Sequence, residues 1–292
     1  MFRLHLLIAL VLTLSWLPGL ARPLAAQEES LPEGVTVDIW ATAVTDAVPE
    51  NANQILLFRM TLAPGAGLPI TPEEGSVSLV EVERGAVTTT VDAPMSVSRA
   101  GAEAGSEEAI PAGEPFTLAM GDSALYGPDL TGEFGNAGTE VASVIVLEAL
   151  PTAAAEEMAF PDGITVEVLA WGETSDLPRG DVLMLIGRFS MEPAAGVPEH
   201  AHPGAELGVL EEGTVAFKTY DGPALQIARQ VAEAMTSGTE PVIETAAPGE
   251  EILAEVGDAV FVPAGNVSET RNGGEGPASA LLGEITVAGE DE

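Results

Sequence analysis

The sequence predicts an all-β protein built from two tandem units, and three observations support this. The apolar segments are short and bounded by glycine and proline, as in the strands of a β-sandwich or barrel. The 292 residues include 32 Gly and 22 Pro, and 46% are apolar, which is enough for one or two packed cores. Segments of the first half also recur in the second. Typical strand segments are "ILLFRMTL", "VLMLIGRF", "LGVLEEGTVAF" and "AVFVPAG".

The internal repeat has the size of a whole domain, which indicates tandem domains and not a solenoid. "GVTVDIW" at Gly34 corresponds to "GITVEVL" at Gly163, at an offset of 129 positions. "RMTLAPGAG" at Arg59 corresponds to "RFSMEPAAG" at Arg188 at the same offset. Because these two arginines recur at equivalent places in an acid-rich chain, we expect them to make structural ion pairs.

The later part of the repeat keeps its order at an offset of 136, so one central loop is longer in the second copy. We therefore predict a first domain over 34–150, a linker over 151–162 and a second domain over 163–288. The longer loop contains the best helical pattern, Pro223 to Met235. The matches at this offset are "GEPFTLAMGD" with "GEEILAEVGD", Asn136 with Asn272, and Glu148 with Glu284.

The first 26 residues, "MFRLHLLIALVLTLSWLPGLARPLAA", have the layout of a signal peptide. A charged start precedes an apolar run, and cleavage after Ala21 or Ala26 fits the small residues there. The prediction is an exported protein, whether secreted, periplasmic or held at the cell surface. An uncleaved membrane anchor is the alternative, because the apolar character continues to Ala26.

The charge balance excludes several classes of partner. The chain has 46 Asp and Glu against 10 Lys and Arg, a formal charge of −36, with Lys218 as the single lysine. Such a surface repels nucleic acids and anionic lipids and attracts cations, so a cation-binding surface is a weaker alternative function. The absence of cysteine excludes disulfides, thiol catalysis and thiolate zinc sites, so stability must come from burial.

The histidines point to metal chemistry in the second copy. His200 and His202 are separated by one alanine, so in a strand both imidazoles lie on the same face. A turn then allows Glu206 to complete a set of three ligands. Two imidazoles and one carboxylate suit Fe, Mn or Zn as divalent ions, which this pattern does not distinguish. The alternative is a solvent-exposed polar turn.

At these residues the sequence resembles the cupin superfamily, and its two copies resemble a bicupin. His200, His202, Glu206 and Gly213 follow the spacing of the family's first motif, although Ala194 stands where the family has a glycine. The second motif is matched by Gly257, Pro263, Gly265 and Asn272, and Ser268 stands at the position of a fourth ligand, a histidine.

The resemblance implies two tandem cupin barrels, each a double-stranded β-helix or jelly roll. It implies a mononuclear metal site at His200, His202 and Glu206, with Ser268 as a pocket residue that fills the place of the fourth ligand. The first copy has lost these ligands and is expected to be a metal-free structural partner. Its substitutions are Thr71 and Glu73 at the histidine positions, Ser78 at the glutamate position and Gly132 at the second-motif histidine.

Two functions follow from the resemblance. One is a metal-dependent oxygenase, decarboxylase or isomerase acting on a small oxygen-rich molecule. The other is a non-enzymatic extracellular cupin, without metal, that binds a small ligand or has a structural role. Both predict a small-molecule partner and leave open a homo-oligomer, and neither assigns catalytic residues. Fold alone does not choose between them.

Overall fold

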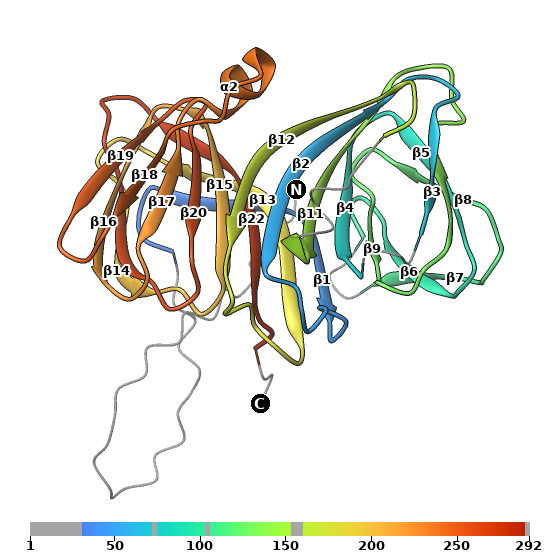
Figure 1. Ribbon diagram of the computed structural model, residues 1–292, viewed down its shortest axis with the longest axis horizontal. Coiled ribbons are helices and arrows are strands. Elements are labelled where there is room, and N and C mark those ends of the chain that lie inside the picture. The colour runs from blue at the N-terminus through green and yellow to red at the C-terminus, as the bar shows by residue number, and fades with distance from the viewer. Residues whose placement is uncertain (1–30, 72–74, 103–105, 153–159, 290–292) are drawn as a thin grey trace, which may run out of the picture.

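The computed structural model describes residues 31–71, 75–102, 106–152 and 160–289. Within these ranges the chain is almost entirely β-strand, arranged as two units side by side (Figure 1). The predicted all-β fold class is confirmed. The predicted signal peptide and Glu73 lie outside the described residues. No described helix is long and apolar enough to cross a membrane.

The first unit consists of a seven-stranded sheet and a four-stranded sheet, both antiparallel. The large sheet has the order β12 (Ile164–Glu173), β2 (Gln54–Leu62), β11 (Ala142–Leu150), β4 (Val77–Arg84), β9 (Ser123–Tyr126), β6 (Met95–Ser98) and β7 (Glu107–Ile110). The small sheet has the order β3 (Gly67–Ile70), β10 (Gly132–Gly135), β5 (Ala86–Val91) and β8 (Phe116–Ala119). Apolar side chains from both sheets form one core inside this unit.

The second unit repeats this plan with equivalent strands. Its large sheet has the order β1 (Val35–Thr45), β13 (Val182–Met191), β22 (Ala278–Val287), β15 (Ala205–Glu212), β20 (Ala259–Val262), β17 (Leu225–Ala228) and β18 (Ile243–Ala246). Its small sheet has the order β14 (Gly196–Ala201), β21 (Val267–Asn272), β16 (Thr214–Asp221) and β19 (Glu251–Glu255). A helix, α2 (Val231–Ser237), follows β17 in the longer loop of this copy.

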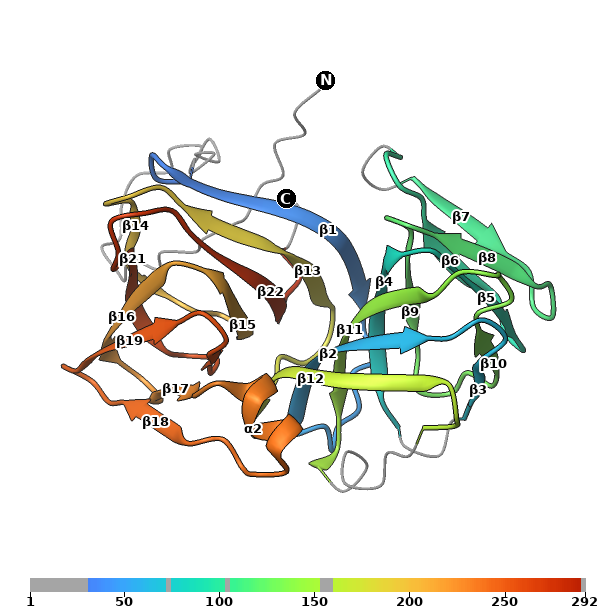
Figure 2. The ribbon, with the colours of Figure 1, turned by 90° about the horizontal axis from the view of Figure 1, so that it is seen from above.

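The first strand of each copy is exchanged between the units. β1 pairs with β13, from Val35 opposite Met191 to Thr45 opposite Val182, and so completes the sheet of the second unit. β12 pairs with β2 and completes the sheet of the first unit. Figure 2 shows β1 running along β13 and β12 running along β2. The repeat in the sequence assigned β1 to 34–150 and β12 to 163–288 and gave no sign of this exchange.

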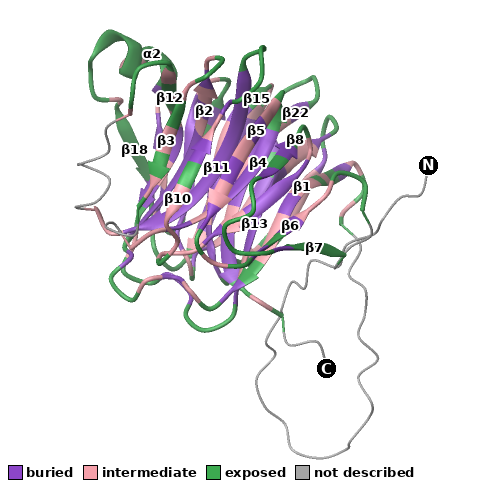
Figure 3. Ribbon diagram, turned by 90° about the vertical axis from the view of Figure 1, so that its right-hand side faces the viewer, coloured by how far each residue is buried: buried purple, intermediate pink, exposed green. Residues whose placement is uncertain are grey.

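The space between the two large sheets is filled by an apolar core shared by both units. Figure 3 shows that buried residues concentrate on the central strands, whereas α2, β18 and β7 are largely exposed. Since side chains from both copies form this core, the units are held together by hydrophobic burial. Its members include Ile55, Leu57, Ile145, Leu147, Met184, Ile186, Leu207, Phe261 and Ile285.

Two arginines bind the exchanged strands to the sheets that these strands join, one through an ion pair and one through a cation–π contact. Arg59 on β2 donates from Nε and Nη2 to both oxygens of Glu83, at 2.9 Å each, and from Nη1 to Glu167 on β12 at 3.1 Å. Arg188 on β13 donates to Glu211 at 2.9 Å, and its guanidinium lies 4.9 Å from the ring centroid of Trp40 on β1. The predicted structural ion pairs of these two arginines are confirmed.

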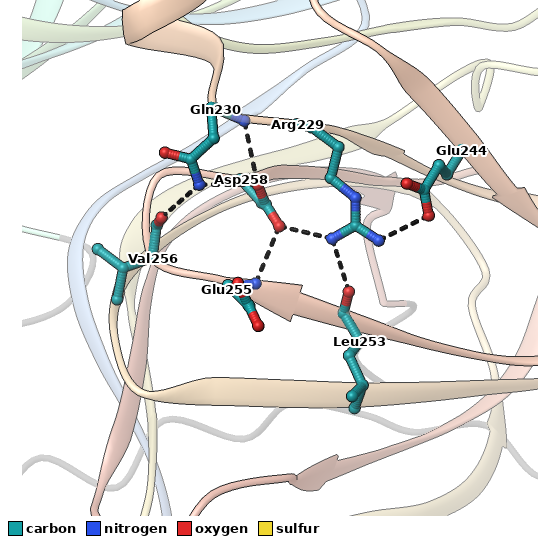
Figure 4. Close-up of polar contacts among 7 residues, drawn as sticks. All are labelled: Arg229, Gln230, Glu244, Leu253, Glu255, Val256 and Asp258. Atoms are coloured by element: carbon teal, nitrogen blue, oxygen red, sulfur yellow. Dashed lines mark hydrogen bonds and ion pairs between the residues drawn. The ribbon is translucent and has the colours of Figure 1, made fainter.

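The repeated Gly-Asp sequence has a structural role in both copies. In the second, the buried Asp258 carboxylate accepts from Arg229 Nη1 at 2.6 Å and from the backbone N–H groups of Gln230 and Glu255 at 3.0 Å each (Figure 4). Asp122 makes the same contacts in the first copy, with the guanidinium of Arg99 and two backbone N–H groups. These carboxylates fix the turns that lead into β20 and β9.

The predicted helix over Pro223 to Met235 is wrong in its first half. Leu225–Ala228 forms β17, which pairs with both β18 and β20, and α2 begins only at Val231. Pairing on both edges satisfies the backbone groups of β17, and this tertiary pairing outweighs the local helical pattern.

A buried carboxyl group lies on the face of the first unit that points toward the second. Glu81 on β4 is 6% exposed, and its Oε2 has no hydrogen-bond partner among the described residues. It shares a strand face with Leu79, a member of the shared core, and lies directly opposite Ser123 on β9. Burial, and secondarily the charge of Glu83, raises the pKa of Glu81 to about 7.

We predict that Glu81→Gln becomes progressively more stable than wild type as the pH rises. The folded-state pKa of about 7 lies above the ordinary value of 4.5, so the stability contributed by this proton is complete below pH 4.5 and lost through pH 7. The difference in unfolding free energy should shift in favour of Glu81→Gln by on the order of 2 kcal/mol between pH 5 and pH 9. Urea titrations at both pH values measure it, and a constant difference contradicts the assignment.

A second prediction concerns the contact between β12 and β20. A Cβ added to Gly172 would overlap the ring of Phe261 in the shared core. Gly172→Ala should therefore lower the free energy of unfolding by about 1–3 kcal/mol, measured by urea denaturation.

Gly276→Ala is the matched control, because nothing lies within 4 Å of a Cβ at that position. The double variant Gly172→Ala/Phe261→Leu should recover part of the loss. If it is as unstable as the single variant, the ring contact is not the cause.

Candidate functional site

The structure brings the four predicted site residues together inside the second unit. His200 is near the end of β14, His202 follows that strand directly, Glu206 lies on β15 and Ser268 on β21. The two imidazole ring centroids are 4.5 Å apart. His200 is half-buried, and His202 is 4% exposed. The alternative of a solvent-exposed polar turn therefore does not describe His202.

Both ring nitrogens of His202 are engaged. Its Nδ1 lies 2.6 Å from Oε1 of Glu206, and its Nε2 lies 3.0 Å from Oγ of Ser268. The Nδ1 of His200 lies 2.8 Å from the backbone oxygen of Pro198 and so donates to it. Ser268 therefore acts as a hydrogen-bond partner of His202, at the position where the resemblance places a fourth ligand.

The charges of the cluster reinforce the contact between His202 and Glu206. Burial acts to lower the pKa of His202, but the charge and hydrogen bond of Glu206 outweigh it and raise that pKa. Burial likewise acts to raise the pKa of Glu206, and His202 outweighs it, so that pKa is lowered. Burial, followed by the repulsion of His202, lowers the pKa of His200. The arrangement favours an imidazolium–carboxylate pair at His202 and Glu206.

The donor atoms do not fit a divalent metal as they are arranged. Glu206 and Ser268 occupy opposite nitrogens of His202, and the lone-pair directions of these nitrogens diverge. An ion at Nε2 would have the ring between it and Glu206. Among the residues that the structure describes, no group of three or more His, Asp or Glu side chains is placed to hold a metal ion. We therefore derive no chemistry through a metal from this geometry.

The inner wall around Ser268 is lined with hydroxyl groups. Thr219 on β16 lies directly opposite Ser268 in the ladder, so the two side chains share the inner face. Thr219 is fully buried, and its Oγ1 has no partner among the described residues. Thr270 follows two residues after Ser268 on the same face and is also buried. An unpartnered buried hydroxyl is costly, which indicates a place for a bound water at this wall.

The first unit fills the equivalent space with large side chains. Phe134 and Tyr126 pack edge to face with ring centroids 6.0 Å apart, and the Tyr126 hydroxyl is 3.0 Å from Thr89 Oγ1. Thr71 is exposed, and Gly132 provides no side chain at the position of Ser268. The interior of this unit is a packed core.

Two residues near the site were not identified from their sequence context. Thr219 belongs to an ordinary strand segment, so nothing local marked it. Glu284 lies opposite Glu206 across the β15–β22 ladder, and burial, with a smaller contribution from Glu206, raises its pKa to about 8. The sequence feature that could have identified Glu284 was its correspondence to Glu148 in the internal repeat. In the first unit Ser78, which replaces Glu206, donates to Glu148 at 3.1 Å.

The approach to β14 explains one departure from the motif. Ala194 has a φ of 65°, in the left-handed region that favours glycine, and Gly65 has a φ of 78° at the equivalent position of the first copy. The backbone therefore keeps the turn that the motif glycine makes, although the sequence has alanine.

No family model and no curated protein matches this chain. The solved structures to which it is similar include pumpkin seed globulin, with 10% identity, a TM-score of 0.44 and coverage of 88% of this chain and 86% of that one. AerE from Microcystis aeruginosa has 12% identity and a TM-score of 0.36, covering 85% of this chain and 98% of that one. A variant of oxalate decarboxylase from Bacillus subtilis has 13% identity and a TM-score of 0.42, with coverage of 88% and 78%.

We predict that Ser268→Ala destabilises the second unit, because it leaves Nε2 of the buried His202 without its partner. The loss should be about 1–3 kcal/mol of unfolding free energy. Ser106→Ala, at an exposed position, is the control and should have almost no effect. Chemical denaturation of both variants measures the difference, and equal stabilities would show that the contact contributes nothing.

Proposed function

We propose that this chain is an exported, non-enzymatic bicupin whose second unit binds a small oxygen-rich molecule directly through its side chains. The observation that carries the proposal is the double engagement of His202, by Glu206 on one ring nitrogen and Ser268 on the other. This supports the hydroxyl-lined wall as the recognition surface.

The chemistry of that wall supports an oxygen-rich ligand. Hydroxyl groups act as donors and acceptors, so Thr219, Ser268 and Thr270 match a molecule that carries several hydroxyl or carbonyl groups. Thr219 Oγ1 is buried without a partner among the described residues, so a ligand that hydrogen-bonds there offsets an existing cost. The packed interior of the first unit supports placing the ligand in the second.

The competing proposal is the metal-dependent oxygenase, decarboxylase or isomerase that the resemblance implies, with His200, His202 and Glu206 as ligands. Such a site would require the ring of His202 to turn and release Glu206 or Ser268. The two proposals therefore differ in one measurable quantity, the metal content of the protein.

We expect less than about 0.1 equivalent of Fe, Mn or Zn per chain in protein produced with all three metals and purified without chelating resin. The double variant His200→Ala/His202→Ala should give the same value by elemental analysis. One metal per wild-type chain, lost in the double variant, would overturn the non-metal proposal and support the enzyme. Metal present equally in both would indicate binding to the acidic surface.

Ligand binding is tested with D-ribose, D-glucose and L-tartrate as probes. At least one should shift the NMR signals of the two imidazoles in the mature chain, with saturation at millimolar concentration. Thr219→Val keeps the shape and removes the hydroxyl, and it should weaken binding about fivefold to tenfold. If no probe shifts these signals, direct binding of this ligand class is contradicted.

A further inference from the structure

A hollow lies outside the histidine cluster, between the two units. It is a cavity of about 350 Å³ between β1 and the outer face of the first unit formed by β4, β9 and β6. This volume falls within the range of small-molecule sites. Its wall includes Ala43, Leu79 and Leu125 on the apolar side and Ser96, Ser98 and Ser123 on the polar side.

The second unit has an equivalent groove, which is occupied by its own apolar side chains. Phe261 stands at the position equivalent to Leu125, and its ring packs against Gly172, the equivalent of Ala43. Val231 of α2 joins the same apolar cluster. A groove that is packed in one copy and hollow in the other shows that the fold does not require the cavity.

Polar residues at the first groove are replaced by apolar residues at the equivalent positions of the second. Ser123 and Ser98 of the first groove correspond to Ala259 and Ala228 of the second, and Glu81 corresponds to Val209. The lining of the hollow groove thus has hydroxyls where the filled groove is apolar, and the buried carboxyl of Glu81 lies on β4 directly beside the lining residue Ser123. Polar substitutions in a buried place are unfavourable unless a partner satisfies them.

The buried carboxyl of Glu81 indicates that this partner carries a positive charge. It lies across the β4–β9 ladder from Ser123, which lines the cavity, and its Oε2 is buried without a partner among the described residues. Glu107 adds a second carboxyl at the exposed rim, and none of the described residues that line the wall is basic. A formal charge of −36 also raises the local concentration of cations over anions.

We propose that this cavity binds a small amphipathic amine, whose apolar body packs on Leu79 and Leu125 and whose ammonium group donates to Glu81. The ligand enters beside Val44, which is 60% exposed at the rim. This site is independent of the histidines, which lie in the interior of the other unit.

The test uses three probes of one shape and different charge, namely 2-phenylethylammonium, 2-phenylethanol and phenylacetate. Calorimetric titration of the mature chain at pH 8 and 0.15 M salt should give one saturable site for the amine. The alcohol should bind about tenfold more weakly, because it lacks the charge-assisted hydrogen bond, and the anion should not bind. No binding of the amine, or equal binding of amine and anion, overturns the proposal.

Two variants locate the site. Glu81→Gln should weaken amine binding by about tenfold or more, and it is expected to fold because it removes a buried charge. Leu125→Phe copies the filled groove and should abolish binding of the amine. Glu114→Gln, an equal change of charge at an exposed position, should leave the affinity unchanged.

The remaining outcomes are equally decisive. If Glu81→Gln and Glu114→Gln bind the amine equally well, binding reflects the acidic surface and the proposal fails. Unchanged binding in the double variant His200→Ala/His202→Ala supports a site outside the histidine cluster. Loss of binding in that variant would place the amine in the second unit and overturn the assignment.

Discussion

The exchange of β1 and β12 between the two units is the constraint on which the rest of the structure depends. Each exchanged strand is the edge of the large sheet that it joins, so without it β13 and β2 would present unpaired backbone groups. Arg59 and Arg188 bind across these junctions, and the shared core lies directly behind them. Each copy of the repeat therefore supplies an edge strand to the large sheet of the other.

The exchange also creates two equivalent grooves and leaves each copy free to use its spaces differently. The first unit has a packed interior around Phe134 and Tyr126 and a hollow groove beside Glu81. The second unit has a hydroxyl-lined interior around Ser268 and a groove filled by Phe261. The two copies share their strands and turns, whereas their interiors and grooves differ.

In the histidine cluster, the motif predicted which residues come together but not the directions of their donor atoms. His200, His202 and Glu206 lie in one place, as their spacing predicted, together with Ser268, which the resemblance to the cupin superfamily placed there. The direction of each donor atom depends on contacts that spacing does not encode. Because Glu206 and Ser268 hold opposite nitrogens of His202, the cluster is a hydrogen-bonded unit, and metal binding there stays a prediction.

The sequence by itself determined the all-β class, the repeat, the turns and the arginine ion pairs, because these follow from local periodicity and from comparison of one copy with the other. The place of Ser268 in the cluster was expected only from the resemblance to the cupin superfamily. Only the tertiary structure decided the strand exchange, the strand at Leu225–Ala228, the role of Thr219 and the isolation of Glu81. The physical reason is common to all four. Strand partners, burial and donor directions arise between segments far apart in the chain, and local patterns carry no information about them.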